Sequence, residues 1–199
     1  LAGVAYVAKH VLGNPVFASF LFIGFVGPAV IAAPLWGRVA KKRGKRRGFM
    51  FASLVMAAGL LANVVTISGH WAPAIVASVV IGIGYAGIQL FPLAMLPDIA
   101  AYDAEVSGKN RIGVYSGVWA GLELLGFALG PAIFGLLLSM GGYVSGGGAQ
   151  PASAGLAIVI GISVIPGVLV LASVLLIRRY RLDDQLKGTA RPEESSSLP

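Results

Sequence analysis

The sequence predicts an all-α fold, a polytopic membrane bundle of six helices of which the first is truncated. Only 12% of the 199 residues are charged and 57% are hydrophobic, whereas about a quarter of the residues in soluble domains are charged. Five stretches of 22 or more residues hold no charge or a single acid, and each can cross a hydrocarbon layer of about 30 Å as a helix. Their apolarity is continuous, while the strands of a membrane barrel alternate in polarity. The sequence therefore predicts membrane-crossing helices.

The predicted crossings are joined by short connections. In chain order they cover residues 16–37, 48–71, 73–97, 112–140 with Glu123 inside, and 152–177. Ahead of them, residues 1–14 are too short for a full crossing, and they begin without an initiator methionine or a signal peptide. We therefore expect the later part of a longer protein. Residues 1–182 then form the bundle, and the polar residues 183–199 are expected to be a disordered cytoplasmic tail.

The net charge of +7 is explained by membrane topology rather than by nucleic-acid binding. Basic clusters follow the first long span, precede the fourth and follow the fifth. Their members are Arg38, Lys41, Lys42, Arg43, Lys45, Arg46 and Arg47, then Lys109 and Arg111, then Arg178, Arg179, Arg181, Lys187 and Arg191. If residues 1–14 count as a crossing, all three clusters lie on one side, which the positive-inside rule assigns to the cytoplasm. The expected partner is a lipid bilayer and not a nucleic acid, and the carboxy terminus is expected in the cytoplasm.

The connections on the other side, at residues 14–15, 68–73 and 141–153, hold no lysine or arginine. Four aromatic residues lie near the span ends, where amphipathic rings favour the headgroup region. These are Trp36, Trp71, Tyr143 and Tyr180, and we expect them to anchor the bundle in the membrane.

Glycine and proline are frequent inside the spans. Gly117 with Gly121, and Gly126 with Gly130, have the small-xxx-small spacing of close helix packing, while prolines kink helices that gate. Both roles for these glycines and prolines, close packing and gating, remain possible interpretations.

Residues 82–87 read Gly-Ile-Gly-Tyr-Ala-Gly and match a dinucleotide-binding pattern. That mechanism needs a strand before the motif, so close helix packing is the better interpretation.

An ionisable side chain in the middle of a span is the strongest functional signal. Glu123 lies eleven residues past Ile112, about 17 Å along a helix, and a carboxyl at that depth is costly to insert. Tyr115 and Trp119 share its helix face, because the three follow i, i+4, i+8 spacing. This face lines a solute cavity, or else Glu123 is held by an interhelical hydrogen bond and Trp119 packs without a ligand.

The preceding span carries polar groups to a similar depth. Gln89 lies eight residues before Pro97, about 12 Å from the inner end, and Tyr85 is one turn further out. Consecutive spans run antiparallel, so the two polar sets face the same layer of the membrane. An aromatic ring beside hydrogen-bonding groups suits a hydroxyl-rich solute. The predicted substrate-binding residues are Glu123, Trp119, Gln89, Tyr85 and Tyr115.

The segment between these two spans resembles a known family. Residues 96–105 read Leu-Pro-Asp-Ile-Ala-Ala-Tyr-Asp-Ala-Glu, and Tyr115, Ser116 and Trp119 follow in the next span. This region resembles the join between helices ten and eleven of the glycoside-pentoside-hexuronide/cation symporters, the melibiose-carrier-like branch of the major facilitator superfamily. Residues 6–14 resemble the end of that family's seventh helix. Residues 37–46 resemble the superfamily's G-x-x-x-D-R-x-G-R-R loop, with a lysine where the motif has aspartate.

The resemblance implies that the bundle is helices seven to twelve, the carboxy-terminal half of a secondary transporter of a bacterial inner membrane. It implies symport of a small solute, a sugar or glycoside, with Na⁺ or H⁺ by alternating access. The family's coupling-cation acids lie in the amino-terminal half, the expected partner, so no cofactor or metal site is expected in this chain. Glu123 stands where the melibiose carrier has lysine, which reverses the charge at a sugar-site position.

The charged residues at the basic end predict a cytoplasmic gate. Asp98 and Asp103 lie on the same side as Arg111, Lys42 and Arg46, and ion pairs among them would help to close the inner gate. Exposed ion pairs are individually worth about 0–1 kcal/mol, so only a network or a partly buried pair biases a gate. A solvated loop that only sets topology is the alternative.

Two other classes of protein compete with a transporter. A membrane-embedded enzyme would need clustered acids or histidines, and Asp98, Asp103 and Glu105 lack metal-ligand spacing. Cysteine is absent, which excludes disulfides and thiolate metal sites. A non-transporting structural subunit would need no ionisable group in mid-membrane, and Glu123 argues against it. We therefore expect a transporter and not an enzyme.

Overall fold

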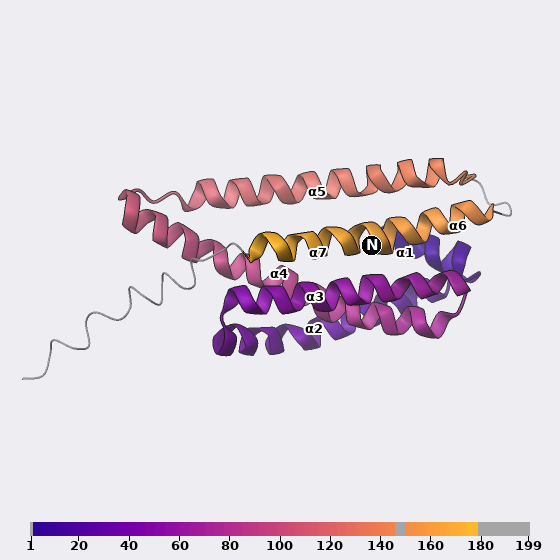
Figure 1. Ribbon diagram of the computed structural model, residues 1–199, viewed down its shortest axis with the longest axis horizontal. Helices are drawn as coiled ribbons and strands as arrows, with labels where there is room; N and C mark the ends of the chain where they lie inside the picture. Colours follow the sequence, from indigo (N-terminus) through magenta and orange to yellow (C-terminus); the bar gives the residue numbers. More distant parts are fainter. Residues whose placement is uncertain (1, 146–149, 179–199) are drawn as a thin grey trace, which may run out of the picture.

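Helices that run along one long axis build the fold. The computed structural model describes residues 2–145 and 150–178, and the regular structure within them is helical. The elements are α1 (Ala2–Tyr6), the π-helix η1 (Val7–Val11), α2 (Phe17–Arg43), α3 (Lys45–Ala62), the 3-10 helix η2 (Asn63–Ser68), α4 (Trp71–Ser107), α5 (Ile112–Met140), α6 (Ala152–Val159), the π-helix η3 (Ile160–Val164) and α7 (Ile165–Ile177) (Figure 1). The tail predicted at 183–199 lies outside the described residues.

Five helical segments are long and apolar enough to cross a membrane. They are Phe17–Arg43, Lys45–Ser68, Trp71–Ser107, Ile112–Met140 and Ala152–Ile177. The five long apolar helices predicted from the sequence are thereby confirmed as candidate crossings, and the chain is an integral membrane protein whose described residues form helices. The helical residues 2–11 ahead of them would extend about 15 Å, which is half the hydrocarbon thickness.

The basic segment after the first long span is helical rather than the expected loop. α2 continues through Arg43, α3 begins at Lys45, and only Gly44 between them leaves helical geometry, with φ 85° and ψ 157°. Glycine reaches this conformation because it lacks the Cβ that would clash there. The basic side chains therefore project from two helix ends in directions that the helices fix.

α4 also extends beyond the end that the sequence predicts. The expected end at Pro97 is wrong, because α4 continues to Ser107 with Pro92 and Pro97 inside it. A proline removes one backbone hydrogen bond and bends a helix, but it does not prevent the next turns from forming. The helix closes at Gly108, whose φ of 67° is left-handed, as is common after a helix end. The family-like residues 98–105 are therefore helix and not loop.

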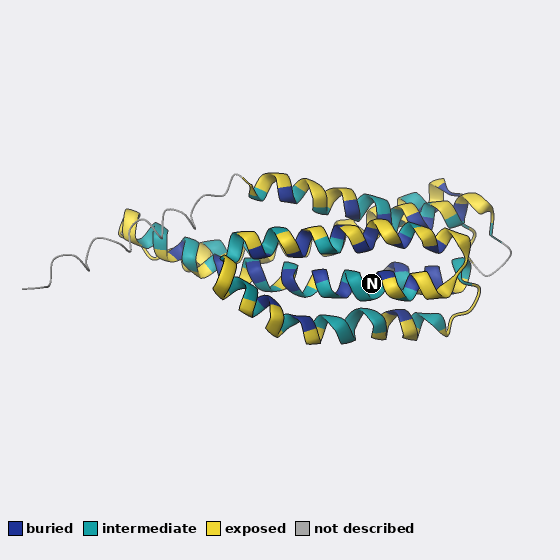
Figure 2. Ribbon diagram, turned by 60° about the horizontal axis from the view of Figure 1, so that its bottom comes forward, coloured by how far each residue is buried: buried dark blue, intermediate teal, exposed yellow. Residues whose placement is uncertain are grey.

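α2, α3 and α4 pack closely through three glycines of α4. A Cβ added at Gly82 would collide with the backbone of α2, one at Gly84 with the backbone of α3, and one at Gly87 with Ala52 of α3. Buried residues follow the facing sides of the packed helices (Figure 2). Close helix packing, the interpretation given to residues 82–87, is confirmed.

Trp36 is a core residue and not the membrane anchor that its place near a span end predicts. Its side chain is only 9% exposed, and its Nε1 donates a 2.8 Å hydrogen bond to the carbonyl oxygen of Ile83. Its ring meets the ring of Phe91 edge-on, with 5.9 Å between centroids. Position along a span sets the depth of a residue but not the helix face that it occupies, which is why the prediction was wrong.

The other three expected anchors differ from one another. Tyr143 is half-buried, and its hydroxyl lies 3.1 Å from Nε2 of His10, so it also serves packing. Trp71 is exposed at the start of α4 and stacks on Phe17, and its role as an anchor stays a prediction. Tyr180 lies outside the described residues.

α5 is covered only near its last turns. Leu138 is its one buried residue and packs in a cluster with Val7 and Ile158. The helix runs along one edge of the structure (Figure 1). A Cβ added at any of the six glycines between positions 113 and 135 would meet nothing within 4 Å. The packing predicted for the pairs Gly117/Gly121 and Gly126/Gly130 is therefore not made by the described residues.

Candidate functional site

Two of the predicted substrate-binding residues share one groove. Tyr85 and Gln89 line an open groove of about 500 Å³ between α2 and α4, whose remaining walls are apolar. The ring of Tyr85 lies 5.1 Å from that of Phe25 on α2, which fixes its orientation. Gln89 is exposed, and its amide has no hydrogen-bond partner among the described residues. The groove thus offers an aromatic ring and an unused amide in an apolar wall, a composition that suits a solute bearing hydroxyl groups.

The other three predicted residues lie on a second face, on α5. Tyr115 and Trp119 are half-buried and Glu123 is exposed. None of the three lines the groove between α2 and α4, and none has a side-chain hydrogen bond within the part of the chain that is described. The structure therefore brings Tyr85 and Gln89 together and keeps the α5 residues as a separate set. Substrate binding by either set stays a prediction.

The polar face and the first glycine pair of α5 point in different directions. At about 100° per residue, Gly117 lies about 200° around the helix from Tyr115, and Gly121 lies about 200° from Trp119. The glycine face lacks a neighbour within the described residues, whereas on the polar face Glu123 is exposed and Tyr115 and Trp119 are half-buried.

An ion pair joins α3 to α4 at the basic end of the bundle. Nζ of Lys45 lies 2.6 Å from Oδ2 of Asp98 and donates a 2.8 Å hydrogen bond to the carbonyl oxygen of Ala94. About a third of each side chain stays exposed, so solvent screens the pair and its contribution falls near the range of about 0–1 kcal/mol for exposed pairs. Asp98 was predicted from the sequence as a gate residue, but Lys45 was not. The available signal was that Lys45 directly follows Gly44, where the chain reverses.

A second pair spans the turn between α4 and α5. Nη1 of Arg111 lies 3.7 Å from Oδ1 of Asp103, with side-chain exposures of 47% and 20%. Oδ2 of Asp103 is buried and has no hydrogen-bond partner among the described residues. A buried acceptor without a partner is costly, so this oxygen is the unsatisfied group of the pair. The structure thus brings these two predicted gate residues together.

The remaining two predicted gate residues differ in their contacts. Arg46 donates from Nε to the carbonyl oxygen of Ile177, at 3.3 Å, and from Nη2 to that of Arg178. Carbonyl oxygens at the end of a helix lack intrahelical partners, and a guanidinium satisfies them well. Arg46 therefore ties α3 to the end of α7. Lys42 is exposed at the end of α2, with no ion pair among the described residues.

A buried polar contact that was not predicted from the sequence joins the span Lys45–Ser68 to the last span. Nδ2 of Asn63 donates a 3.0 Å hydrogen bond to Oγ of Ser163, and both residues are buried. Asn63 begins the 3-10 helix η2 and Ser163 lies in the π-helix η3, so two departures from α-helical geometry meet at this bond. Such departures re-aim side chains within a helix. A single asparagine inside an apolar span was the signal that could have identified it.

A polytopic helical membrane protein with polar side chains inside its spans and charge pairs at one end has the features of a transporter. A family model described as MFS/sugar transport protein matches residues 1–184, and the chain belongs to this family, the melibiose-carrier-like branch of the major facilitator superfamily. The family consists of transporters and not of enzymes. No curated protein matches the chain. Among the described residues no group of three histidines and acids could hold a metal ion.

Proposed function

We propose that this chain is the carboxy-terminal half of a twelve-helix secondary transporter that moves a sugar or glycoside by alternating access, coupled to Na⁺ or H⁺. Residues 1–182 are helices seven to twelve in this proposal, with α1 and η1 as the end of helix seven and residues 183–199 as a cytoplasmic tail. Family membership supports a sugar as the solute. The observation that carries the proposal is α5, a candidate membrane span on which the carboxyl-bearing Glu123 is exposed.

α5 needs a covering partner in the membrane. A carboxyl that faced hydrocarbon would cost a few kcal/mol on insertion scales and more in simulations, so Glu123 must face protein or water. The glycine pair on the other side of the helix permits close approach of another helix. We infer that the amino-terminal six helices cover one side of α5 and that the other side borders the solute pathway.

The predicted residues of the α2–α4 groove and those of α5 together suit a sugar. Tyr85, Trp119 and Tyr115 supply aromatic faces for the apolar side of a pyranose ring, while Gln89 and Glu123 supply groups that bond to hydroxyls. We propose that rocking of the two halves brings the α5 face and the α2–α4 groove to the border of one midplane cavity. The coupling cation binds mainly in the amino-terminal half.

The charged end serves as the cytoplasmic gate in this proposal. We propose that this end faces the cytoplasm across a bacterial inner membrane: the basic residues that surround Gly44 favour the cytoplasmic side by the positive-inside rule, and family membership supports the choice of membrane. The Lys45–Asp98 and Arg111–Asp103 pairs link three consecutive spans at that end, and they would help to hold the inner gate closed in the outward-open state.

The test is a set of substitutions in the transporter, assayed by binding and uptake of radiolabelled glycosides in proteoliposomes. Glu123→Gln keeps shape and hydrogen bonding but removes the charge, and we expect solute affinity to fall by about tenfold, since hydrogen bonds to charged groups contribute about 1.5–3 kcal/mol. Trp119→Ala and Gln89→Ala should weaken binding in the same assay. Glu105→Gln, an exposed acid at the end of α4, is the matched control and should bind normally.

Each alternative has a distinct outcome. Unchanged binding and uptake in all three variants would show that these residues pack and that the solute pathway lies elsewhere. If Glu123→Gln lost uptake but kept normal solute binding, Glu123 would be assigned to the coupling of solute and cation movement. Absence of any uptake by the wild-type transporter under gradients of Na⁺ and H⁺ would favour a non-transporting membrane subunit.

A further inference from the structure

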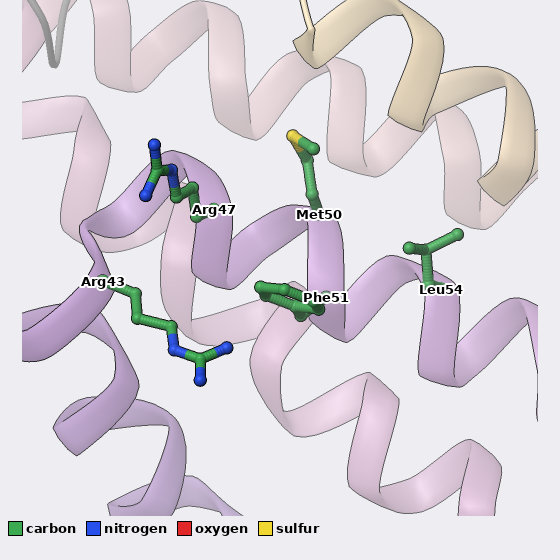
Figure 3. Close-up of a pocket in the computed structure, with 5 residues that line it drawn as sticks. All are labelled: Arg43, Arg47, Met50, Phe51 and Leu54. Carbon is green, nitrogen blue, oxygen red and sulfur yellow. The ribbon is translucent and has the colours of Figure 1, made fainter.

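A second open groove lies at the basic end of the bundle, away from Tyr85 and Gln89. It has a volume of about 440 Å³ and is lined by Arg43, Arg47, Met50, Phe51 and Leu54 (Figure 3). Arg43 is the last residue of α2, and the other four residues lie on α3. The two arginines therefore stand on either side of the reversal at Gly44.

The groove is charged at one end and apolar along the rest. Arg47, Met50, Phe51 and Leu54 follow i, i+3, i+4, i+7 spacing and share one face of α3 over about 10 Å. Phe51 and Leu54 are each 44% exposed, so the apolar stripe is open to the membrane environment. The guanidinium carbon of Arg43 lies 5.5 Å from the centroid of the Phe51 ring, which holds the cation over the start of the stripe.

The positive charge in this groove is not neutralised by any residue that the structure describes. Lys45 and Arg46 are bound within the bundle, whereas Arg43 and Arg47 have no ion pair or hydrogen bond from their side chains in the part of the chain that the structure describes. Both arginines are exposed. A guanidinium binds phosphate oxygens through two parallel N–H groups, so each of these unpaired arginines is able to bind a phosphate group.

We propose that this groove binds one anionic phospholipid, with its phosphate between Arg43 and Arg47 and an acyl chain along Met50, Phe51 and Leu54. A free phosphate would use only the charged end and would leave the apolar stripe empty. The groove lies where α2 ends and the span Lys45–Ser68 begins, which is the depth of the lipid headgroups. A zwitterionic lipid would bring a cation beside the two arginines, so the groove selects lipids with net negative charge.

The test is native mass spectrometry of the purified protein titrated with dioleoyl phosphatidylglycerol or dioleoyl phosphatidylcholine. We expect the first phosphatidylglycerol to bind at least about tenfold more tightly than phosphatidylcholine. The double variant Arg43→Gln/Arg47→Gln should lose about 10- to 30-fold in affinity for phosphatidylglycerol, since each basic residue near a lipid surface contributes about a factor of five. The matched control is Arg38→Gln/Lys41→Gln, which removes the same charge from exposed positions outside the groove and should keep the wild-type affinity.

Three results would overturn the proposal. Equal affinities for the two lipids would remove the anion preference. An equal loss in both double variants would mean that net charge, and not this groove, attracts the lipid. Displacement of phosphatidylglycerol by inorganic phosphate or by the deacylated headgroup glycerophosphoglycerol at similar concentrations would show that the acyl chain contributes nothing.

Discussion

Nζ of Lys45 lies 2.6 Å from Oδ2 of Asp98, and this contact joins the first residue of α3 to α4 across 53 positions of sequence. The same ammonium also bonds to the carbonyl oxygen of Ala94, one turn earlier in α4. Pro97 stands between the two acceptors in the sequence, and because proline lacks an N–H it cannot donate the intrahelical hydrogen bond to the carbonyl oxygen of Leu93, the residue before Ala94. Lys45 thus binds α4 beside the point where its ladder is interrupted.

We expect the Lys45–Asp98 pair to influence conformation more than stability. Asp98→Asn or Lys45→Met should change the free energy of unfolding by no more than about 1 kcal/mol, because both side chains are partly exposed. If the pair helps to close the gate, each variant should raise the labelling rate of a cysteine introduced at Ser116. The chain has no cysteine of its own, so the reporter is unique in it.

Lys41→Met is the control for this measurement, because Lys41 is exposed and is not part of the pair. The charge-swapped variant Lys45→Asp/Asp98→Lys should restore part of the wild-type labelling rate. Labelling rates that are the same in the wild type and in both single variants would count against a gating role.

Glycine packing in α4 should be sensitive to one methyl group. Gly82→Ala places a Cβ against the backbone of Phe25, which must move, and overpacking of this kind costs about 1–3 kcal/mol. Gly27→Ala on α2 meets nothing within 4 Å and should be neutral or slightly stabilising. Thermal unfolding of the two variants in detergent tests the contrast, and equal midpoints would show that α2 and α4 are not in close contact.

The Asn63–Ser163 hydrogen bond should stabilise the bundle modestly. Ser163→Ala leaves the buried amide of Asn63 without its acceptor, and hydrogen bonds between membrane helices contribute about 0.6 kcal/mol on average, with a maximum near 1.7. Asn63→Leu/Ser163→Ala removes both partners and should recover most of the loss, because no buried polar atom is left unpaired. A double-mutant cycle measures the coupling between the two residues. A coupling energy of zero would mean that the contact adds no stability.

If the chain is one half of a twelve-helix transporter, as proposed above, the glycine face of α5 should matter only when the other half is present. Gly121→Leu creates no clash within the described residues, so insertion and expression should match the wild type. In the twelve-helix transporter the larger side chain should block close packing of the halves and lower uptake strongly. Gly155→Leu on α6, which also meets nothing within 4 Å, is the control. Normal uptake by Gly121→Leu would show that no helix docks on this face.

The sequence alone determined the membrane crossings and the packing of the 82–87 motif. Crossings depend on local composition, because a hydrocarbon layer requires about 20 apolar residues in succession wherever they occur. The glycines of this motif could be assigned to helix packing, because a dinucleotide-binding motif needs a preceding strand and the sequence predicts none there. The family resemblance of residues 96–119 depended on the identity and order of residues, which need no tertiary information.

Only the tertiary structure decided which side chains meet. The sequence placed Trp36 at a span end but not on the core face of α2, and it placed the basic cluster on one side but did not select Lys45 as the partner of Asp98. Depth along a helix follows from counting residues, whereas the direction of a side chain depends on how each helix is rotated against its neighbours. Contacts between residues far apart in sequence fix this rotation. The rotation places Tyr85 and Gln89 in one groove and leaves Glu123 on a separate helix face.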